Sequence, residues 1–364
     1  MNKTTSHFNP TKEQEQAKTL QLTPVSAFLS DYKSELGDGS KEYRGIESGF
    51  KAVDDMISGL DKFILLAGRS GAGKTTLALQ LALGVARKGT PVIIYSLEMS
   101  RSEIISKLVQ IMASFMGNKL YLSTIDLQYN DPSLDKKYKE IIDDALDQLD
   151  KIGDHLYIKD GLNGIPRIAL YANETPPKQG ELRTIQQDVV DAKARHNADK
   201  VLVVIDSVQD VVDTANGNQT QAEVEAVNRI VALQQSTDAT VLCTAQKNKT
   251  SINSNDPYGD IMGSMSFIHK PNTVLALETP REMICKTGKG KGKNGGLDKT
   301  QNKDLNEIEK QAKEGGGKPM VLEQVKGRYT GVKNLGLTYY GAFGYFSDEI
   351  DQNYADLFES YDLK

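Results

Sequence analysis

The 364-residue sequence has no tryptophan, only two cysteines and only four histidines. Cys243 and Cys285 do not form a Cys-x-x-Cys motif, which argues against a disulfide framework and against a cysteine zinc site. The scarcity of histidine argues against a histidine-based metal centre. No apolar run approaches the roughly 18 residues that a membrane-spanning helix requires, and the first residues lack a signal-peptide pattern. We therefore expect a cytoplasmic protein without membrane contacts.

No charge sign dominates. Lys and Arg total 44 against 49 Asp and Glu, which gives a net charge of -5. This balance excludes a uniformly basic nucleic-acid coat protein but permits a local basic channel. The length suffices for one large or two modest domains, each with its own hydrophobic core.

The main domain is expected at 41–346, where short apolar runs alternate with helical patterns. Near-continuous apolar strands between helices predict an α/β fold: a mainly parallel, twisted sheet with helices on both faces. The strands are expected at Lys62–Ala67, Pro91–Leu97, His155–Lys159, Val201–Ile205, Thr240–Thr244, Thr273–Leu277 and Val321–Val325. Inside this domain, 286–318 is expected to be a flexible insertion, because Lys286–Gly296 holds four lysines and five glycines.

Three further segments flank the main domain. Residues 1–22 are polar and aperiodic, and we expect a disordered tail. Residues 23–40 combine a helical apolar stripe over Val25–Leu36 with a glycine-rich linker, and the stripe packs either on its own domain or on a neighbouring subunit. The acidic tail 347–364 also carries an apolar stripe. It either binds a partner protein, mimics DNA, or packs on the core.

A phosphate-binding loop is the strongest motif in the sequence. An apolar strand precedes it and a helix follows it, as the G-x-x-x-x-G-K-[ST] pattern requires. Its glycines allow backbone N–H groups to surround phosphate oxygens, and the helix adds its positive end. We assign to ATP binding the residues Gly68, Arg69, Ser70, Gly71, Ala72, Gly73, Lys74, Thr75 and Thr76.

Two carboxylates follow apolar strands and complete the expected site. Asp206 ends Val201–Ile205 at the sheet edge where ligands bind in such folds, so Thr75 and Asp206 are expected to hold Mg²⁺. Glu98 follows Pro91–Leu97, the next strand after the loop helix. Glu98 is therefore expected to polarise the attacking water, with Lys74 contacting the terminal phosphates.

The order of these motifs resembles that of the DnaB-type replicative helicases. The resemblance covers roughly Gln21–Phe346, and it lacks that family's large N-terminal, primase-contacting domain. It rests on the stretches Gly45-Ile46-Glu47-Ser48-Gly49-Phe50, Val53-Asp54, Ser96-Leu97-Glu98-Met99-Ser100, Asp206-Ser207-Val208-Gln209, Ala245-Gln246 and Lys326-Gly327-Arg328-Tyr329-Thr330-Gly331.

The resemblance implies a RecA-like P-loop core in a homo-oligomeric ring, expected to be a hexamer, with ATP at the subunit interfaces. It implies that Gln246 senses the γ-phosphate, and that Arg328, with Lys326 beside it, reaches the neighbouring subunit's ATP. It also implies that the helix at Val25–Leu36 docks on the next subunit. Lys247 and Lys249 would contact single-stranded DNA from a loop.

The function that these expectations favour is an ATP-dependent hexameric helicase or translocase on single-stranded DNA, with the acidic tail as a contact for a replication partner. Two alternatives stay open. One is a RecA-like recombination or annealing ATPase that forms filaments, and the other is a nucleotide-gated scaffold ATPase whose turnover is indifferent to DNA. ATP hydrolysis with and without single-stranded DNA separates the scaffold from the motors.

Overall fold

A computed structural model describes 25–27, 29, 33, 43–118, 120, 136–161, 184–212, 218–247, 265–290, 292, 297–313, 316–350, 352–361 and 363. The chain divides into two compact units, 1–42 and 43–364. In the first unit, Val25–Ala27 form a 3₁₀ turn, η1. The predicted tail 1–22 and most of the predicted helix at Val25–Leu36 lie outside the described residues.

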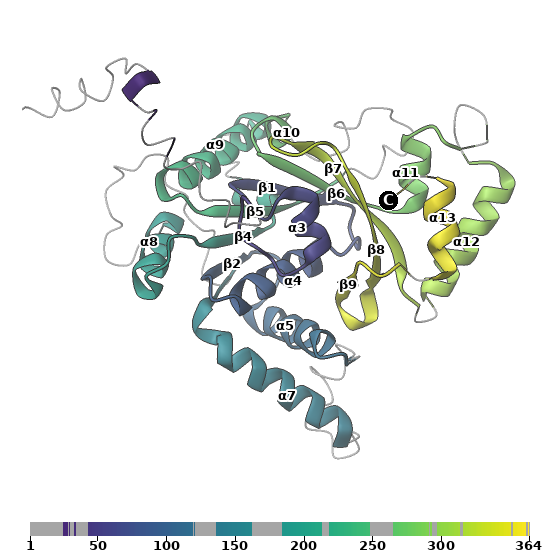
Figure 1. Cartoon of the computed structure of the whole chain (residues 1–364), viewed down its shortest axis with the longest axis horizontal. Coiled ribbons are helices and arrows are strands. Elements are labelled where there is room, and N and C mark those ends of the chain that lie inside the picture. The colour runs from purple at the N-terminus through teal and green to yellow at the C-terminus, as the bar shows by residue number, and fades with distance from the viewer. Residues whose placement is uncertain are drawn as a thin grey trace, which may run out of the picture. The chain divides into compact units, whose positions relative to one another are not determined.

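The second unit is built on one sheet with the order β3-β2-β4-β5-β1-β6-β7-β8-β9 (Figure 1). Its first six strands are mutually parallel. They are β3 (Leu156–Asp160), β2 (Val92–Ser96), β4 (Leu202–Asp206), β5 (Thr240–Gln246), β1 (Phe63–Gly68) and β6 (Thr273–Glu278). Strands β1, β2 and β4 are buried at every residue, as expected for central parallel strands covered on both faces. The predicted α/β fold with a mainly parallel sheet is confirmed.

Three antiparallel strands extend the sheet beyond β6. Strand β7 (Lys318–Gly327) runs against β6, and β8 (Asn334–Tyr340) and β9 (Tyr345–Ser347) follow. The sequence predicts only β7 among them. Because β7 runs antiparallel to β6, the last residues of β7 lie beside the first residues of β6.

Helices cover both faces of the sheet, as predicted. One hydrophobic cluster holds Ile64, Leu66 and Ile94 against α3 (Lys51–Ile57), α4 (Lys74–Arg87), α5 (Arg101–Phe115) and α7 (Lys136–Ile152). The opposite faces of the same strands, including Leu65 and Ile93, pack against α8 (Ile185–His196), α9 (Gln219–Thr237) and α10 (Ser266–His269). Among the described helices none is long and apolar enough to cross a membrane.

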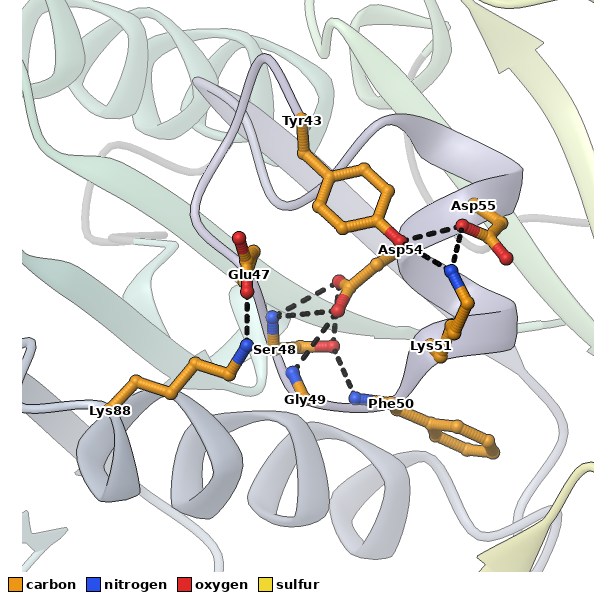
Figure 2. Close-up of polar contacts among 9 residues, drawn as sticks. All are labelled: Tyr43, Glu47, Ser48, Gly49, Phe50, Lys51, Asp54, Asp55 and Lys88. Carbon is orange, nitrogen blue, oxygen red and sulfur yellow. Dashed lines mark hydrogen bonds and ion pairs between the residues drawn. The ribbon is translucent and has the colours of Figure 1, made fainter. Parts of the chain in front are cut away.

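The loop before α3 is fixed to the core by a buried carboxylate (Figure 2). Asp54, 2% exposed, accepts hydrogen bonds from the backbone N–H of Ser48 at 3.0 Å, the Ser48 hydroxyl at 2.8 Å and the N–H of Gly49 at 3.1 Å. A Cβ atom on Gly84 of α4 would lie 1.7 Å from the Ser48 carbonyl oxygen. The loop therefore lies directly against the helix that follows the phosphate loop.

A third hydrophobic cluster involves two polar segments of the chain. The segment 286–318, predicted to be flexible, contains α12 (Lys299–Lys313), where Leu305 is buried. The acidic tail forms α13 (Gln352–Ser360), next to α11 (Pro280–Lys286) in Figure 1. Tyr354 and Phe358 of α13 pack with Met283 and Val321. The buried aromatic side chains agree with the interpretation in which the tail packs on the core.

Candidate active site

The phosphate loop connects β1 to α4 in the centre of the sheet. Gly71 and Gly73 have φ angles of +75° and +93°, which side chains rarely adopt. A Cβ atom on Gly73 would also lie 2.8 Å from Cζ of Phe346 and 3.0 Å from Cζ of Tyr339, two stacked rings of the β8–β9 hairpin. The glycine is thus required by its φ angle and by this aromatic contact. The loop ends at the N-terminus of a 14-residue helix, where backbone N–H groups and the helix dipole favour an anion.

Lys74 is the first residue of α4 and points back to its own loop. Its Nζ donates to the carbonyl oxygen of Arg69 at 3.1 Å. Burial lowers the pKa of Lys74, and the negative charges of Asp206 and Glu98 oppose that shift. The ammonium therefore lies near both predicted carboxylates, in a half-buried position that a phosphate could share.

Asp206, at the end of β4, meets the first turn of α4. The Thr75 hydroxyl donates to Asp206 Oδ2 at 2.8 Å, although 131 residues separate the two in the chain. Thr244 of β5 donates to Asp206 Oδ1. Asp206 is 5% exposed and Thr244 is fully buried, so the two hydroxyls fix the carboxylate from both sides. The sequence analysis does not identify Thr244, because its role depends on β5 lying next to β4 in the sheet.

Glu98 is exposed and follows β2 at the same edge of the sheet. Partial burial of its carboxyl group raises its pKa, the negative charges of Asp206 and Asp210 raise it further, and Lys74 opposes them. Asp210 belongs to the 3₁₀ turn η4 (Val208–Val211), where its carboxylate accepts from the N–H and the hydroxyl of Ser207. Asp210 is a second residue that the sequence analysis misses.

The donor set fits a magnesium ion that accompanies a nucleotide. Mg²⁺ prefers oxygen ligands and takes one or two from the protein, while substrate phosphates and water supply the rest. Thr75 and Asp206 offer such oxygens at hydrogen-bond distance from each other. The described residues contain no group of three or more His, Cys, Asp or Glu that could enclose a metal by themselves.

Gln246 and Lys247 follow each other at the end of β5, but only Gln246 remains available to a ligand. In the β1–β5 register Gln246 lies opposite Gly68, and its side chain is half-buried. The Lys247 side chain is 4% exposed and pairs with Glu278 at the end of β6, itself 2% exposed. This differs from the expected DNA contact, because Glu278 draws the ammonium into the core. Lys249 lies outside the described residues.

Two acidic side chains, Glu278 and Glu282, lie near the phosphate loop or the residue that follows β5. Burial raises the pKa of Glu278 to about 7, although Lys247 opposes the shift. Arg69, predicted to bind the nucleotide, pairs through Nε with Oε1 of Glu282 in α11 at 2.6 Å. Helix α11 therefore holds the loop through a charged contact at Arg69.

Lys326 and Arg328 lie at the end of the sheet where the parallel strands begin, opposite the end that carries the phosphate loop. In the β6–β7 register Gly327 pairs with Thr273, the first residue of β6, whereas Gly68 of the phosphate loop lies opposite Leu277. The two positions are four residues apart along β6, which is about 13 Å. The turn is therefore far from the phosphate loop of its own chain.

The Lys326 ammonium is engaged within its own chain. It donates to the carbonyl oxygens of Ile268 at 3.0 Å, His269 at 2.6 Å and Pro271 at 2.8 Å, at the end of α10. Burial lowers its pKa, and the nearby charge of Arg328 adds to the shift. This contrasts with the expectation that Lys326 contacts a nucleotide, because carbonyl groups left free at the end of a helix attract a cation.

The chain is similar to known helicases in sequence. A family model described as "DnaB-like helicase C terminal domain" matches residues 45–311. The chain is 26% identical over 219 residues to a probable replicative DNA helicase of Guillardia theta, covering 59% of this chain and 32% of the relative. It is 38% identical over 92 residues to the replicative DNA helicase DnaB of Leifsonia xyli subsp. xyli, covering 24% and 20%. The matches thus span about a third or less of these relatives.

Solved structures resemble the whole fold. An ATPase domain solved on its own aligns with a TM-score of 0.67 and 17% identity, over 91% of this chain and 100% of that one. A DnaB-like replicative helicase, studied with its interactions with primase, aligns with a TM-score of 0.65 and 17% identity, over 92% of this chain and 70% of that one. At these identities the likeness supports the fold.

Proposed function

This chain belongs to the DnaB-like helicase C-terminal domain family, and we propose that it hydrolyses ATP as a hexameric ring that moves along single-stranded DNA. The observation that carries the proposal is the hydrogen bond between Thr75 and Asp206 at the N-terminus of α4. It joins the phosphate loop to the acidic end of β4, with Lys74 and Glu98 close enough to influence each other's pKa.

Each residue has a separate part in the reaction. The loop N–H groups and Lys74 bind the β- and γ-phosphates of ATP. Thr75 and Asp206 would hold Mg²⁺, which would supply positive charge beside those phosphates. Glu98 accepts a hydrogen bond from the attacking water and orients it toward the γ-phosphorus. Gln246, opposite Gly68, contacts the γ-phosphate and reports its presence to the segment after β5.

Arg328 acts on the nucleotide of a neighbouring subunit. Its position about 13 Å along β6 from the phosphate loop supports this assignment, because the turn lies at the opposite end of the parallel strands from its own loop. A guanidinium beside the transferring phosphoryl group accelerates hydrolysis by about 10³–10⁵-fold, so supplying it from another subunit makes turnover depend on assembly.

The first test is ATP hydrolysis with and without single-stranded DNA, with Glu98→Gln protein as the blank. Stimulation that weakens steeply with added salt supports a DNA motor, since phosphate contacts release counterions. Turnover that is insensitive to DNA at every salt concentration contradicts the motor and favours the scaffold ATPase. Long DNA-coated filaments in negative-stain images would instead favour the recombination ATPase.

The second test asks whether the site is shared between subunits. Arg328→Ala and Glu98→Gln proteins are each expected to be inactive alone. When mixed, some interfaces combine an intact Arg328 with an intact Glu98, and activity should return. No recovery in rings shown to exchange subunits argues against the shared site.

A further inference from the structure

The turn after β7 is closed by contacts within itself. A Cβ atom on Gly327 would lie 2.1 Å from Nε2 of Gln324 and 2.7 Å from Oγ1 of Thr330. The same Nε2 donates to Thr330 Oγ1 at 2.5 Å, and the N–H of Arg328 donates to the carbonyl oxygen of Asn272 at 3.1 Å. These contacts tie Gly327, Arg328 and Thr330 to neighbouring residues.

Tyr329 connects this turn to the segments on either side of α3. The guanidinium carbon of Arg44 lies 3.8 Å from the centroid of the Tyr329 ring, a cation–π geometry. Lys62 donates through Nζ to the Tyr329 hydroxyl at 3.1 Å. The ring is nonetheless 48% exposed. Tyr329 is therefore held by two cations distant in sequence, not by burial.

Arg44 is itself well anchored. Its Nε pairs with Oδ2 of Asp61 at 3.3 Å, and its N–H donates to Ser58 Oγ at 3.2 Å. Figure 2 shows the neighbouring Tyr43, whose hydroxyl donates to Oδ1 of Asp55 at 2.6 Å and accepts from Lys51 at 3.2 Å. The support for Tyr329 is thus continuous with the loop that Asp54 fixes to the core.

Arg328 stands apart from its anchored neighbours. Lys326 caps α10, Gly327 closes the turn, and Tyr329 lies against Arg44. The Arg328 side chain is exposed and, within the described part of the chain, has no hydrogen-bond or ion-pair partner. A single unpaired guanidinium is thereby presented on a fixed turn.

We propose that Arg44 and Tyr329 are positioning residues for Arg328. They hold the 326–331 turn at the angle at which the guanidinium reaches the γ-phosphate of the adjacent subunit. The inference rests on the proposed function of Arg328 and adds two residues that the phosphate-loop motifs do not include. Transition-state contacts tolerate little displacement, and an error of about 1 Å can cost about 100-fold in rate.

The experiment compares Tyr329→Ala, Tyr329→Phe and Arg44→Ala with wild-type protein in steady-state ATP hydrolysis. Tyr329→Ala and Arg44→Ala should lower kcat about 10- to 100-fold, while KM for ATP, Tm and affinity for a fluorescent ATP analogue stay near wild type. Tyr329→Phe keeps the ring face for Arg44 and should stay within about threefold. Val332→Ala, a 70% exposed side chain just beyond the turn, is the matched control and should be unchanged.

A structural role can be separated from a positioning role by mixing. Tyr329→Ala should regain activity when mixed with Glu98→Gln, as Arg328→Ala does, because each defect lies on a different side of the interface. The Arg44→Ala, Tyr329→Ala double variant should be no slower than Tyr329→Ala alone, because Tyr329→Ala already removes the contact with Arg44.

The outcomes distinguish failure of the inference from failure of the proposed function. If Arg328→Ala keeps full turnover, the proposed role of Arg328 fails and the inference fails with it. If Arg328→Ala is inactive while Tyr329→Ala and Arg44→Ala keep wild-type kcat, only the inference is overturned. It is also overturned if Tyr329→Ala fails to assemble and recovers wild-type kcat once assembly is forced at high protein concentration.

Discussion

Replacing Lys247 by methionine should destabilise the fold substantially, because it leaves a carboxylate buried without its partner. The Lys247 and Glu278 side chains are 4% and 2% exposed. Removing one partner of such a buried pair costs about 3–5 kcal/mol. Methionine keeps most of the apolar stem of lysine, so the loss reports the missing charge rather than a cavity. We expect a loss of about 3 kcal/mol in the free energy of unfolding at pH 8.

The loss should also grow with pH. Burial raises the pKa of Glu278 from 4.5 to about 7 in the folded protein, against the opposing charge of Lys247. A raised folded-state pKa means that this contribution to stability is complete below pH 4.5 and is lost as pH rises through the folded pKa, by about 1.4 kcal/mol per pH unit. In wild type this loss levels off near pH 7. Without Lys247 the pKa of Glu278 rises further, so Lys247→Met should keep losing stability above pH 7.

Urea unfolding of nucleotide-free protein at pH 6, 7 and 8 measures both effects. Lys88→Met is the matched control, because Lys88 pairs with Glu47 on the surface, with exposures of 46% and 42%; it should change stability by about 1 kcal/mol or less. The Lys247→Met, Glu278→Gln double variant should recover part of the loss. If Lys247→Met costs under about 1 kcal/mol and follows the wild-type pH slope, the buried pair is absent and Lys247 becomes a candidate DNA contact again.

Three further predictions test the site and its support. Asp210→Asn should shift the acid limb of the pH–rate profile to lower pH, because it removes a negative charge that raises the pKa of Glu98, while Glu98→Gln should abolish turnover at every pH. Thr244→Val should weaken the site by about 1.5–3 kcal/mol, because Asp206 loses a charge-assisted hydrogen bond, and the Mg²⁺ concentration at half-maximal activity should rise about 10-fold or more. Gly84→Ala should lower stability by about 1–3 kcal/mol in thermal unfolding, despite alanine's better helix propensity, because its Cβ would lie 1.7 Å from a carbonyl oxygen.

The sequence predicts those parts of the site that depend on local sequence motifs. The phosphate loop needs a strand, a glycine turn and a helix in direct succession, and Glu98 and Asp206 each end an apolar run. Thr244 could not be predicted in the same way. Its role depends on β5 lying next to β4 in the sheet, and no local pattern states that order.

Lys247 also depends on the strand order, but here the sequence predicts a functional contact and the structure shows a buried ion pair. In sequence it is a lysine at the start of a polar loop, which is typical of a phosphate contact. Its burial depends on Glu278, 31 residues later, reaching it from the far side of β1. A charge that pairs across a strand cannot be distinguished from a solvent-exposed charge until the strand order is known.

The polar C-terminal elements are hard to predict because they bury few residues. Helix α12 has a fully polar first turn, and its buried side chains include Gln301 and Leu305. Composition therefore indicates flexibility there. The tail helix α13 is recognisable from its stripe, but only the cluster with Met283 and Val321 shows what the stripe covers.

The direction of β7 supports the proposal that Arg328 acts on the nucleotide of a second copy. All six parallel strands end at the edge that carries the phosphate loop, Glu98 and Asp206. Because β7 runs antiparallel to β6, the turn it leads into lies at the other edge, about 13 Å away along the strand. Tyr329 and Arg44 hold the turn there. Under the proposed function Arg328 serves the nucleotide of another subunit, so ATP turnover per chain should fall when the protein is diluted below its assembly concentration.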